Sequence, residues 1–220
     1  MNIENKKALI LVDLQNDFCK NGSLAVPDGD AVIALANQLQ DYFGIVVVSK
    51  DWHPADHMSF ASNHSGKKVG DVVLVHGIQQ ILWPDHCVQH TPGAELHPEL
   101  NLHSINHIVH KGIQKTIDSY SVFFDNEHLR ATDLTNYLHK KNVTDVYIMG
   151  LATDYCVKYS CLDAVKLGFN TYIIVDACRG VELNPGDIQA ALQEAEAVGV
   201  KMMSSAEIME HSGSWRSDKK

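Results

Sequence analysis

Short apolar segments alternate along the chain with longer segments of mixed polarity, which is the pattern of an α/β protein. The apolar segments are rich in β-branched residues and almost free of charge, as is typical of strands that are covered on both faces. We predict five such strands and a weaker sixth: Ala8–Val12, Ile45–Ser49, His107–His110, Val146–Met149, Thr171–Val175 and Val200–Met203.

The intervening segments show apolar residues at helical spacing or a high helix propensity. The predicted helices are Asp30–Phe43, Thr132–His139, Cys156–Leu167 and Asp187–Val198. This alternation predicts a three-layer α/β fold, in which an open parallel sheet of about six strands carries helices on both faces.

At 220 residues the chain fits one domain, which we place over residues 1–212, with a polar C-terminal tail over 213–220. The connection from Ser59 to Asn106 carries several glycines and prolines and is predicted to be irregular. A connection of that length inside a compact domain usually serves function.

Charge and cysteine content exclude several classes of partner and compartment. The net charge of -9 argues against binding to nucleic acid or to an anionic membrane. No apolar run is long enough for a membrane helix, and the polar start MNIENKK is unlike a signal peptide. Five cysteines, an odd and small number, predict free thiols in a reducing cytoplasm. The 13 histidines prompt a search for a metal site.

Residues that can carry chemistry follow the predicted strands. In chain order they are Asp13, Asp51, His53, Lys111, Cys156 and Asp176. Ligands of a parallel α/β sheet bind beyond the carboxyl ends of its strands. We therefore expect a nucleophile, a base, a cation and metal ligands to meet at one edge of the sheet.

Cys156 falls in the first turn of a predicted helix, in the segment GLATDYCVKYS. The helix dipole and free N–H groups there favour a thiolate and can stabilise an oxyanion. The alternative is a buried structural cysteine, which is the common fate of a free thiol and the one we expect for Cys161.

Asp13 and Lys111 each end a predicted strand. A carboxyl group at a buried strand end has a raised pKa unless it is paired, which suits a general base. An ammonium near Asp13 and Cys156 would stabilise a thiolate. Helix capping or a surface ion pair is the alternative for each residue taken singly.

Asp51 and His53 point to the same side of an extended segment and can bind one divalent ion. A catalytic metal site needs about three protein ligands, and we choose His86 as the third. His57 is either a fourth ligand or a group just outside the ligand shell. Cys87 adjoins His86 and is expected to be a bystander. Taken alone, the D-x-H pattern is equally typical of a surface loop.

Five ordered motifs resemble the nicotinamidase/pyrazinamidase group of the isochorismatase-like hydrolases. They are LVDLQNDF (Leu11–Phe18), DWHPADHMSFAS (Asp51–Ser62), WPDHCVQ (Trp83–Gln89), HKG with DSYSVF (His110–Gly112 and Asp118–Phe123) and GLATDYCVKYS (Gly150–Ser160). The motifs span nearly the whole chain in the family's order, which makes the resemblance specific.

The resemblance implies a role for each matching residue. It implies a catalytic triad of Asp13, Lys111 and Cys156, and a metal held by Asp51, His53 and His86. His57 matches a position that only some members use as a ligand. An oxyanion hole is implied from the N–H groups of Ala152 and Cys156, with a cis peptide bond at Leu151–Ala152. Phe18, Trp83 and Tyr120 are implied to line the substrate pocket; from the residues alone, Phe18 and Trp83 fit core packing equally well.

The implied reaction is hydrolysis of nicotinamide to nicotinate and ammonia through a Cys156 thioester, with pyrazinamide also accepted. One divalent metal, zinc before iron or manganese, would orient the pyridine ring. The product would feed NAD salvage. The sequence leaves the oligomeric state open, with a homo-oligomer as one alternative. The rival hypotheses are another amidase or carbamoyl hydrolase on the same scaffold and a non-catalytic binding module. The first strand–helix connection lacks a Gly-rich phosphate loop, which counts against a nucleotide-binding module.

Overall fold

The computed structural model describes residues 6–215, and its centre is a parallel sheet of six strands in the order β5-β2-β1-β6-β7-β8. The strands of this sheet are β1 (Lys6–Val12), β2 (Ile45–Asp51), β5 (His107–Lys111), β6 (Val143–Leu151), β7 (Asn170–Arg179) and β8 (Lys201–Met203). Each predicted strand is present, and most are longer than predicted because their ends are less apolar than their centres.

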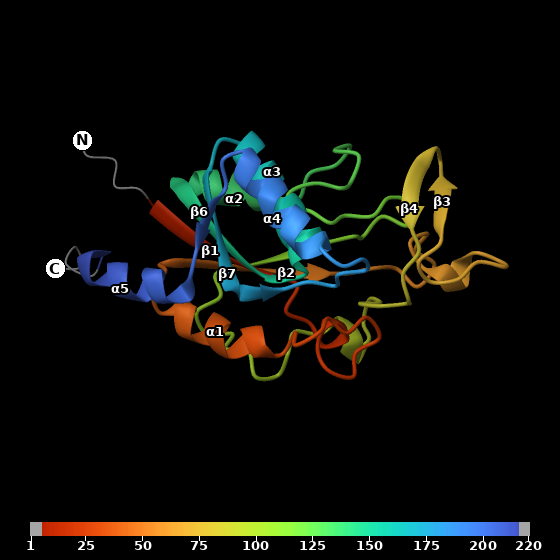
Figure 1. Ribbon diagram of the computed structural model, residues 1–220, viewed down its shortest axis with the longest axis horizontal. Coiled ribbons are helices and arrows are strands. Elements are labelled where there is room, and N and C mark those ends of the chain that lie inside the picture. The colour runs from red at the N-terminus through yellow and green to blue at the C-terminus, as the bar shows by residue number, and fades with distance from the viewer. Residues whose placement is uncertain (1–5, 216–220) are drawn as a thin grey trace.

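Helices cover both faces of the sheet (Figure 1). Helices α2, α3 and α4 lie on one face, and α1 and α5 lie on the other. Their bounds are α1 (Ala31–Gln40), α2 (Leu134–Lys140), α3 (Lys158–Lys166), α4 (Asp187–Ala197) and α5 (Ser205–Trp215). The predicted three-layer α/β fold is confirmed.

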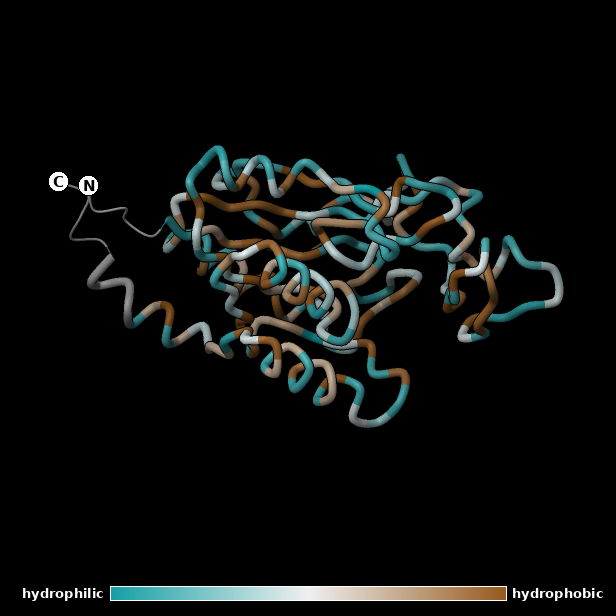
Figure 2. Tube along the Cα trace, turned by 90° about the horizontal axis from the view of Figure 1, so that it is seen from above, coloured by the Kyte–Doolittle hydropathy of each residue, from teal (hydrophilic) through white to brown (hydrophobic). Residues whose placement is uncertain are grey.

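The central strand β1 forms the middle of the core. Its residues from Ala8 to Val12 have no exposed surface, because strands pair with it on both sides and helices cover it above and below. Figure 2 shows this as apolar strands running through the middle of the molecule, with polar positions concentrated on the outer turns and helices.

The connection predicted to be irregular contains a hairpin of β3 (Val72–Val75) and β4 (Ile78–Ile81), which projects from the end of the sheet (Figure 1). Its two-residue turn, His76 and Gly77, has positive φ at both positions, the geometry that suits the twist of a tight hairpin. The rest of this connection holds the short helices η2 (Ala61–Asn63) and η3 (Pro92–Ala94).

Helix α5 is an addition to the predicted elements. It covers the first three residues of the predicted tail, and residues 216–220 lie outside the described part of the chain. Asp176, which was predicted to end its strand at the active-site edge, instead accepts hydrogen bonds from the N–H and Oγ of Ser205 and fixes the start of α5. Within residues 6–215, no helix has the length and apolar character that a membrane crossing requires.

Candidate active site

The carboxyl ends of three neighbouring strands bring the first site residues together. Asp13 directly follows β1, Asp51 ends β2 and Lys111 ends β5. Parallel pairing of β2 with β5 sets Asp51 directly opposite Lys111. All three side chains are buried, so each charge needs a partner inside the protein.

Lys111 supplies that partner for both carboxylates. Its Nζ lies 2.8 Å from Asp13 Oδ2 and 2.7 Å from Asp51 Oδ1, and it donates to the carbonyl oxygen of Ser119 at 2.9 Å. Burial acts to lower the pKa of Lys111, but Asp13 and Asp51 outweigh it and raise that pKa well above its ordinary value. The side chain is therefore a permanent ammonium.

Cys156 completes this cluster from the segment after β6, the strand that pairs with β1 on the side away from β2. Its Sγ lies 3.3 Å from the Lys111 Nζ, and the sulfur belongs to one close group with the carboxylates of Asp13 and Asp51. Cys156 sits in η4 (Thr153–Val157), a π-helical turn that precedes α3, and not in a regular first α-helical turn as predicted. The wider π turn joins strand β6 to the helix and directs the thiol toward Lys111.

The protonation of the thiol differs from the prediction. Burial raises the pKa of the Cys156 thiol well above its ordinary value, Lys111 opposes this rise, and the carboxylates of Asp13 and Asp51 add to it. The resting group is therefore a thiol and not the thiolate that a helix dipole alone would favour. Its activation requires transfer of the proton to a base.

Asp13 is positioned to be that base. Its carboxylate accepts a hydrogen bond from Ser49 Oγ at 2.6 Å, while its backbone N–H donates to the same Oγ at 3.1 Å. Burial raises the pKa of Asp13, and the Lys111 ammonium moderates the rise. Close approach of the backbones is needed here, since a Cβ on Gly150 of β6 would overlap the Val12 carbonyl oxygen.

Asp51, His53 and His86 form a second buried group beside the first. Asp51 Oδ2 lies 3.5 Å from His53 Nε2 and 3.8 Å from His86 Nε2. Two ligand atoms about 2.1 Å from a tetrahedral ion are themselves about 3.4 Å apart, so this spacing suits one divalent cation. A β-bridge between His53 and Val88 brings His86 to the site from a distant part of the sequence.

Hydrogen bonds orient both imidazoles toward that cation position. The Nδ1 of His53 meets the Gly112 carbonyl oxygen at 2.9 Å, and the Nδ1 of His86 meets the Pro84 carbonyl oxygen at 2.7 Å. With Nδ1 as the donor, each Nε2 presents a lone pair, and His53 Nε2 is buried without a hydrogen-bond partner. Burial and His53 lower the pKa of His86 to about 4, so it is neutral. These three residues fit a bound metal.

His57 lies just outside this group. Its ring centroid is 4.3 Å from that of His53, but its Nδ1 contacts Ser59 Oγ at 2.7 Å and its Nε2 faces the Ile117 carbonyl oxygen at 3.4 Å. Both ring nitrogens thus have other partners, although His57 also forms a separate metal-type group with His53 and Asp118. Cys87 belongs to none of the metal-type groups among the described residues.

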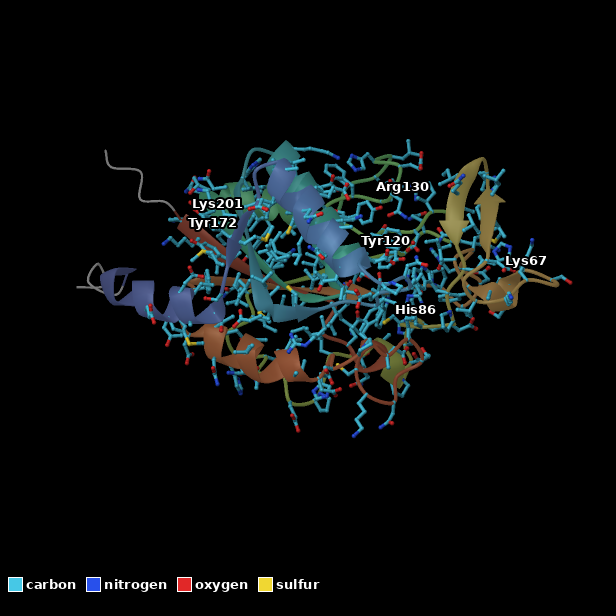
Figure 3. The ribbon with its side chains drawn as sticks, in the orientation of Figure 1. Lys67, His86, Tyr120, Arg130, Tyr172 and Lys201 are labelled. Carbon is cyan, nitrogen blue, oxygen red and sulfur yellow. The ribbon has the colours of Figure 1, made fainter. Side chains whose placement is uncertain are left out.

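An aromatic pocket opens directly onto the reactive groups. Phe18, Trp83 and Tyr120 line it together with Ala152 and Cys156, and it holds about 380 Å³ including its open mouth. Trp83 Nε1 donates to the Tyr120 hydroxyl at 3.3 Å. His86 and Tyr120 lie at one end of the sheet, and the Tyr172–Lys201 pair lies at the opposite end (Figure 3).

The backbone of the predicted oxyanion hole lies in the same pocket. The Leu151–Ala152 peptide bond is cis, as the family resemblance implies. Ala152 precedes the π turn and lines the pocket wall beside Cys156.

Sequence reasoning missed several residues of the site. Tyr155 packs edge-on against Trp83 at 5.0 Å between ring centroids, and Asp118 lines the pocket near His57. Gln15 accepts from the N–H of Asp51 and donates to its carbonyl oxygen, which fixes the strand end. Each lies within four residues of a predicted site residue or inside a quoted motif, and that proximity was the available signal.

Comparison with known proteins shows that the sequence is similar to one family of hydrolases over nearly its whole length. The family profile described as the isochorismatase domain matches residues 7–207. The nicotinamidase of Acinetobacter baylyi is 46% identical over 205 residues, which covers 93% of this chain and 95% of the relative. The nicotinamidase of Escherichia coli is also 46% identical, over 94% of this chain and 99% of the relative.

Solved structures show the same relationship. An Acinetobacter baumanii nicotinamidase/pyrazinamidase superposes with a TM-score of 0.90 at 44% identity, covering 93% of this chain and 98% of that one. The yeast nicotinamidase bound to the inhibitor nicotinaldehyde superposes with a TM-score of 0.85 at 34% identity, covering 90% of this chain and 99% of that one. A Pyrococcus horikoshii pyrazinamidase in complex with zinc superposes with a TM-score of 0.73 at 35% identity, covering 90% of this chain and 99% of that one.

Proposed function

This chain belongs to the isochorismatase family, and from that premise we propose that it is a nicotinamidase, which hydrolyses nicotinamide to nicotinate and ammonia. At the coarser level it is a hydrolase that acts on amides, since relatives 46% identical over most of the chain are nicotinamidases. One observation carries the proposal most directly. The buried Cys156 thiol lines an aromatic pocket and lies within hydrogen-bonding distance of the Lys111 ammonium, which in turn pairs with the Asp13 carboxylate.

The first half of the reaction forms a thioester. Asp13 takes the proton of the Cys156 thiol, and the sulfur attacks the carbonyl carbon of the amide. The N–H groups of Ala152 and Cys156 hold the oxygen as it becomes negative. Lys111 stays charged and stabilises both the carboxylate and the sulfur. Asp13 then returns the proton to the leaving nitrogen, and ammonia departs as the carbon–nitrogen bond breaks.

The second half reverses these roles with water. Asp13 takes a proton from the water, the hydroxide oxygen attacks the thioester carbon, and the carbon–sulfur bond breaks to release nicotinic acid, which loses its carboxyl proton to the released ammonia or to solvent and becomes nicotinate. The proton returns to the sulfur and restores the thiol. The described chain contains every group that these steps use, so the proposed chemistry needs no second copy.

Asp51, His53 and His86 would hold a divalent metal at the edge of this pocket, with zinc favoured by one carboxylate and two imidazoles, and iron or manganese as alternatives. When bound, such an ion supplies a Lewis acid that can take the ring nitrogen and so fix the orientation of the amide. The zinc complex of the related pyrazinamidase supports this assignment. Phe18, Trp83 and Tyr120 would enclose the ring.

Pyrazinamide keeps the amide and a ring nitrogen in the same relative position, so we propose it as a second substrate. The bacterial relative named nicotinamidase/pyrazinamidase, 36% identical over 91% of this chain, supports that choice. The nicotinate formed would serve NAD salvage.

The experiment that tests the proposal measures ammonia release by the purified protein from nicotinamide, pyrazinamide and benzamide. Benzamide has the same amide and shape but lacks the ring nitrogen. We expect turnover of the first two and a kcat/KM for benzamide at least about 100-fold lower, the loss expected for one missing specific interaction with the bound ion. Equal turnover of benzamide would contradict the role given to the ring nitrogen, and no ammonia from nicotinamide would contradict the function.

A further inference from the structure

One group of metal-type ligands among the described residues shares no member with the others and includes a residue of the loop that follows β1. Its members are Cys19, Asp30 and His97, whose sulfur, carboxylate and imidazole atoms lie within 4.8 Å of one another. They come from the residue after η1 (Asn16–Phe18), the residue before α1 and the segment after η3. None of the three is part of the site described above.

One separation in this group equals one in the group of Asp51, His53 and His86. His97 Nε2 lies 3.5 Å from Asp30 Oδ1, the same separation as between Asp51 and His53. That separation again suits two ligands of one tetrahedral cation. Cys19 is buried, with 2% of its surface exposed, but this residue and His97 both line a surface hollow. A cation could therefore reach the group from solvent.

Contacts outside its own helix orient the side chain of Asp30. This residue directly precedes α1 with helical backbone angles, φ -62° and ψ -27°, and so lacks the extended geometry of a capping residue. Here the side chain makes no capping bond. One oxygen instead accepts from the Lys20 N–H at 2.9 Å, which leaves the other directed at His97. The carboxylate is thus held in the orientation of a ligand and not of a cap.

One contact opposes a metal at His97. The Glu99 N–H lies 3.3 Å from His97 Nδ1, whereas a metal on Nε2 places the ring proton on Nδ1. This contact is long and exposed, so the Glu99 N–H can turn to water at little cost. The backbone N–H of His97 is anchored separately, by donation to the Leu14 carbonyl oxygen.

We propose that Cys19, Asp30 and His97 form a second metal site, which takes a thiophilic divalent cation such as zinc with water as the fourth ligand. A thiolate and an imidazole select such an ion over magnesium or calcium. Binding replaces the thiol proton, which leaves to solvent. The ion ties the loop that carries Phe18, a wall of the pocket, to the segment around His97. This site is independent of the proposed function.

Cobalt(II) provides a probe that separates the two sites, because a thiolate ligand gives a charge-transfer absorption in the near ultraviolet. We would strip the full-length protein of metal with a chelator and titrate it with cobalt(II). The proposal predicts two ions per chain and a thiolate-to-cobalt band. In Cys19→Ser the band disappears and one ion remains. His97→Gln, a change at a partly exposed residue, weakens cobalt binding at this site about 10- to 100-fold.

Cys156→Ser is the matched control, since Cys156 is the thiol nearest the first site. The band should persist in this variant. Far-ultraviolet circular dichroism of each variant, compared with that of the unaltered chain, verifies folding. Absence of the thiolate-to-cobalt band, a band unchanged in Cys19→Ser or a band lost in Cys156→Ser would each overturn the proposal, whereas one ion per chain with the Cys19-dependent band would overturn only the metal site at Asp51, His53 and His86.

Discussion

At the scale of single residues, the site is organised around one buried ammonium. Lys111 is 1% exposed and pairs with the carboxylates of Asp13 and Asp51 while it touches the Cys156 sulfur. Those charges can be buried only as a set, because an unpaired carboxylate in this environment would lose its hydration without compensation. The residue to which we assign a role in the proposed chemistry is thus also a requirement of the fold.

Replacement of Lys111 by methionine should therefore affect both stability and catalysis. We expect Lys111→Met to lower the free energy of unfolding by about 3–5 kcal/mol, the usual cost of leaving a buried charge unpaired. Urea denaturation measures this loss, and an ammonia assay on the folded fraction should show no turnover.

Lys115→Met provides the comparison. Lys115 also pairs with a carboxylate at 2.8 Å, that of Asp56, but both side chains are more than half exposed. Solvent screening limits such a pair to about 0–1 kcal/mol. Similar losses in the two variants would contradict the account of Lys111.

Apart from Asp176, the residues expected at the strand ends do gather at the site, but their protonation was not predictable from the sequence. Asp13, Asp51, Lys111 and Cys156 follow buried strands, and the topology of a parallel sheet then brings them to one edge. The state of the thiol could not be predicted in this way. It depends on the depth of burial and on the distances to three charged groups, and both are tertiary properties.

At the scale of elements, the strands were predictable and the peripheral elements were not. The sheet strands are buried on both faces and therefore carry an unmistakable apolar pattern. The hairpin of β3 and β4 is largely exposed, and its signal was the turn residues His76 and Gly77 between two short β-type runs. Helix α5 was not predicted, and only its last three residues fall within the segment 213–220 that was predicted to be a tail.

The close contact between β1 and β6 places a strict demand on one glycine. Gly150 has a φ of 126°, and an added Cβ would overlap the backbone of Val12, directly before Asp13. We expect Gly150→Ala to destabilise the protein by roughly 3 kcal/mol, from overpacking and backbone strain. It should also reduce activity in the protein that still folds, because β1 must move.

Gly44→Ala is the control for that measurement. The Cβ of an alanine at position 44 would meet no atom within 4 Å. Thermal or urea denaturation should place this variant within about 1 kcal/mol of the unaltered chain. A Gly150→Ala variant as stable and active as Gly44→Ala would show that the strand contact does not position the site.

At the scale of the whole molecule, the proposed catalytic metal joins segments that are far apart in the sequence. Asp51 and His53 lie at the end of β2, whereas His86 lies in the long connection that also carries the β3–β4 hairpin. A shared ion would fasten this connection to the sheet. Metal binding should therefore stabilise the fold as well as support catalysis.

Removal of the metal tests this coupling. Dialysis against a chelator should abolish ammonia release and lower the Tm, and addition of zinc, iron(II) or manganese(II) should restore both. His86→Ala should reproduce the loss of activity, while His103→Ala, at an exposed position, should leave it unchanged. Full activity of a verified metal-free protein would contradict the assignment of Asp51, His53 and His86.

The central claim is that the sulfur of Cys156 attacks the amide, and ammonia release by two cysteine variants tests it most directly. Cys156 and Cys161 are both buried thiols, but only Cys156 touches Lys111, whereas Cys161 packs in the core from α3. We predict that Cys156→Ala loses at least about a thousandfold in kcat at nicotinamide saturation while Cys161→Ala stays within a few fold of the unaltered chain. A folded Cys156→Ala variant that still releases ammonia at the rate of Cys161→Ala would contradict the account.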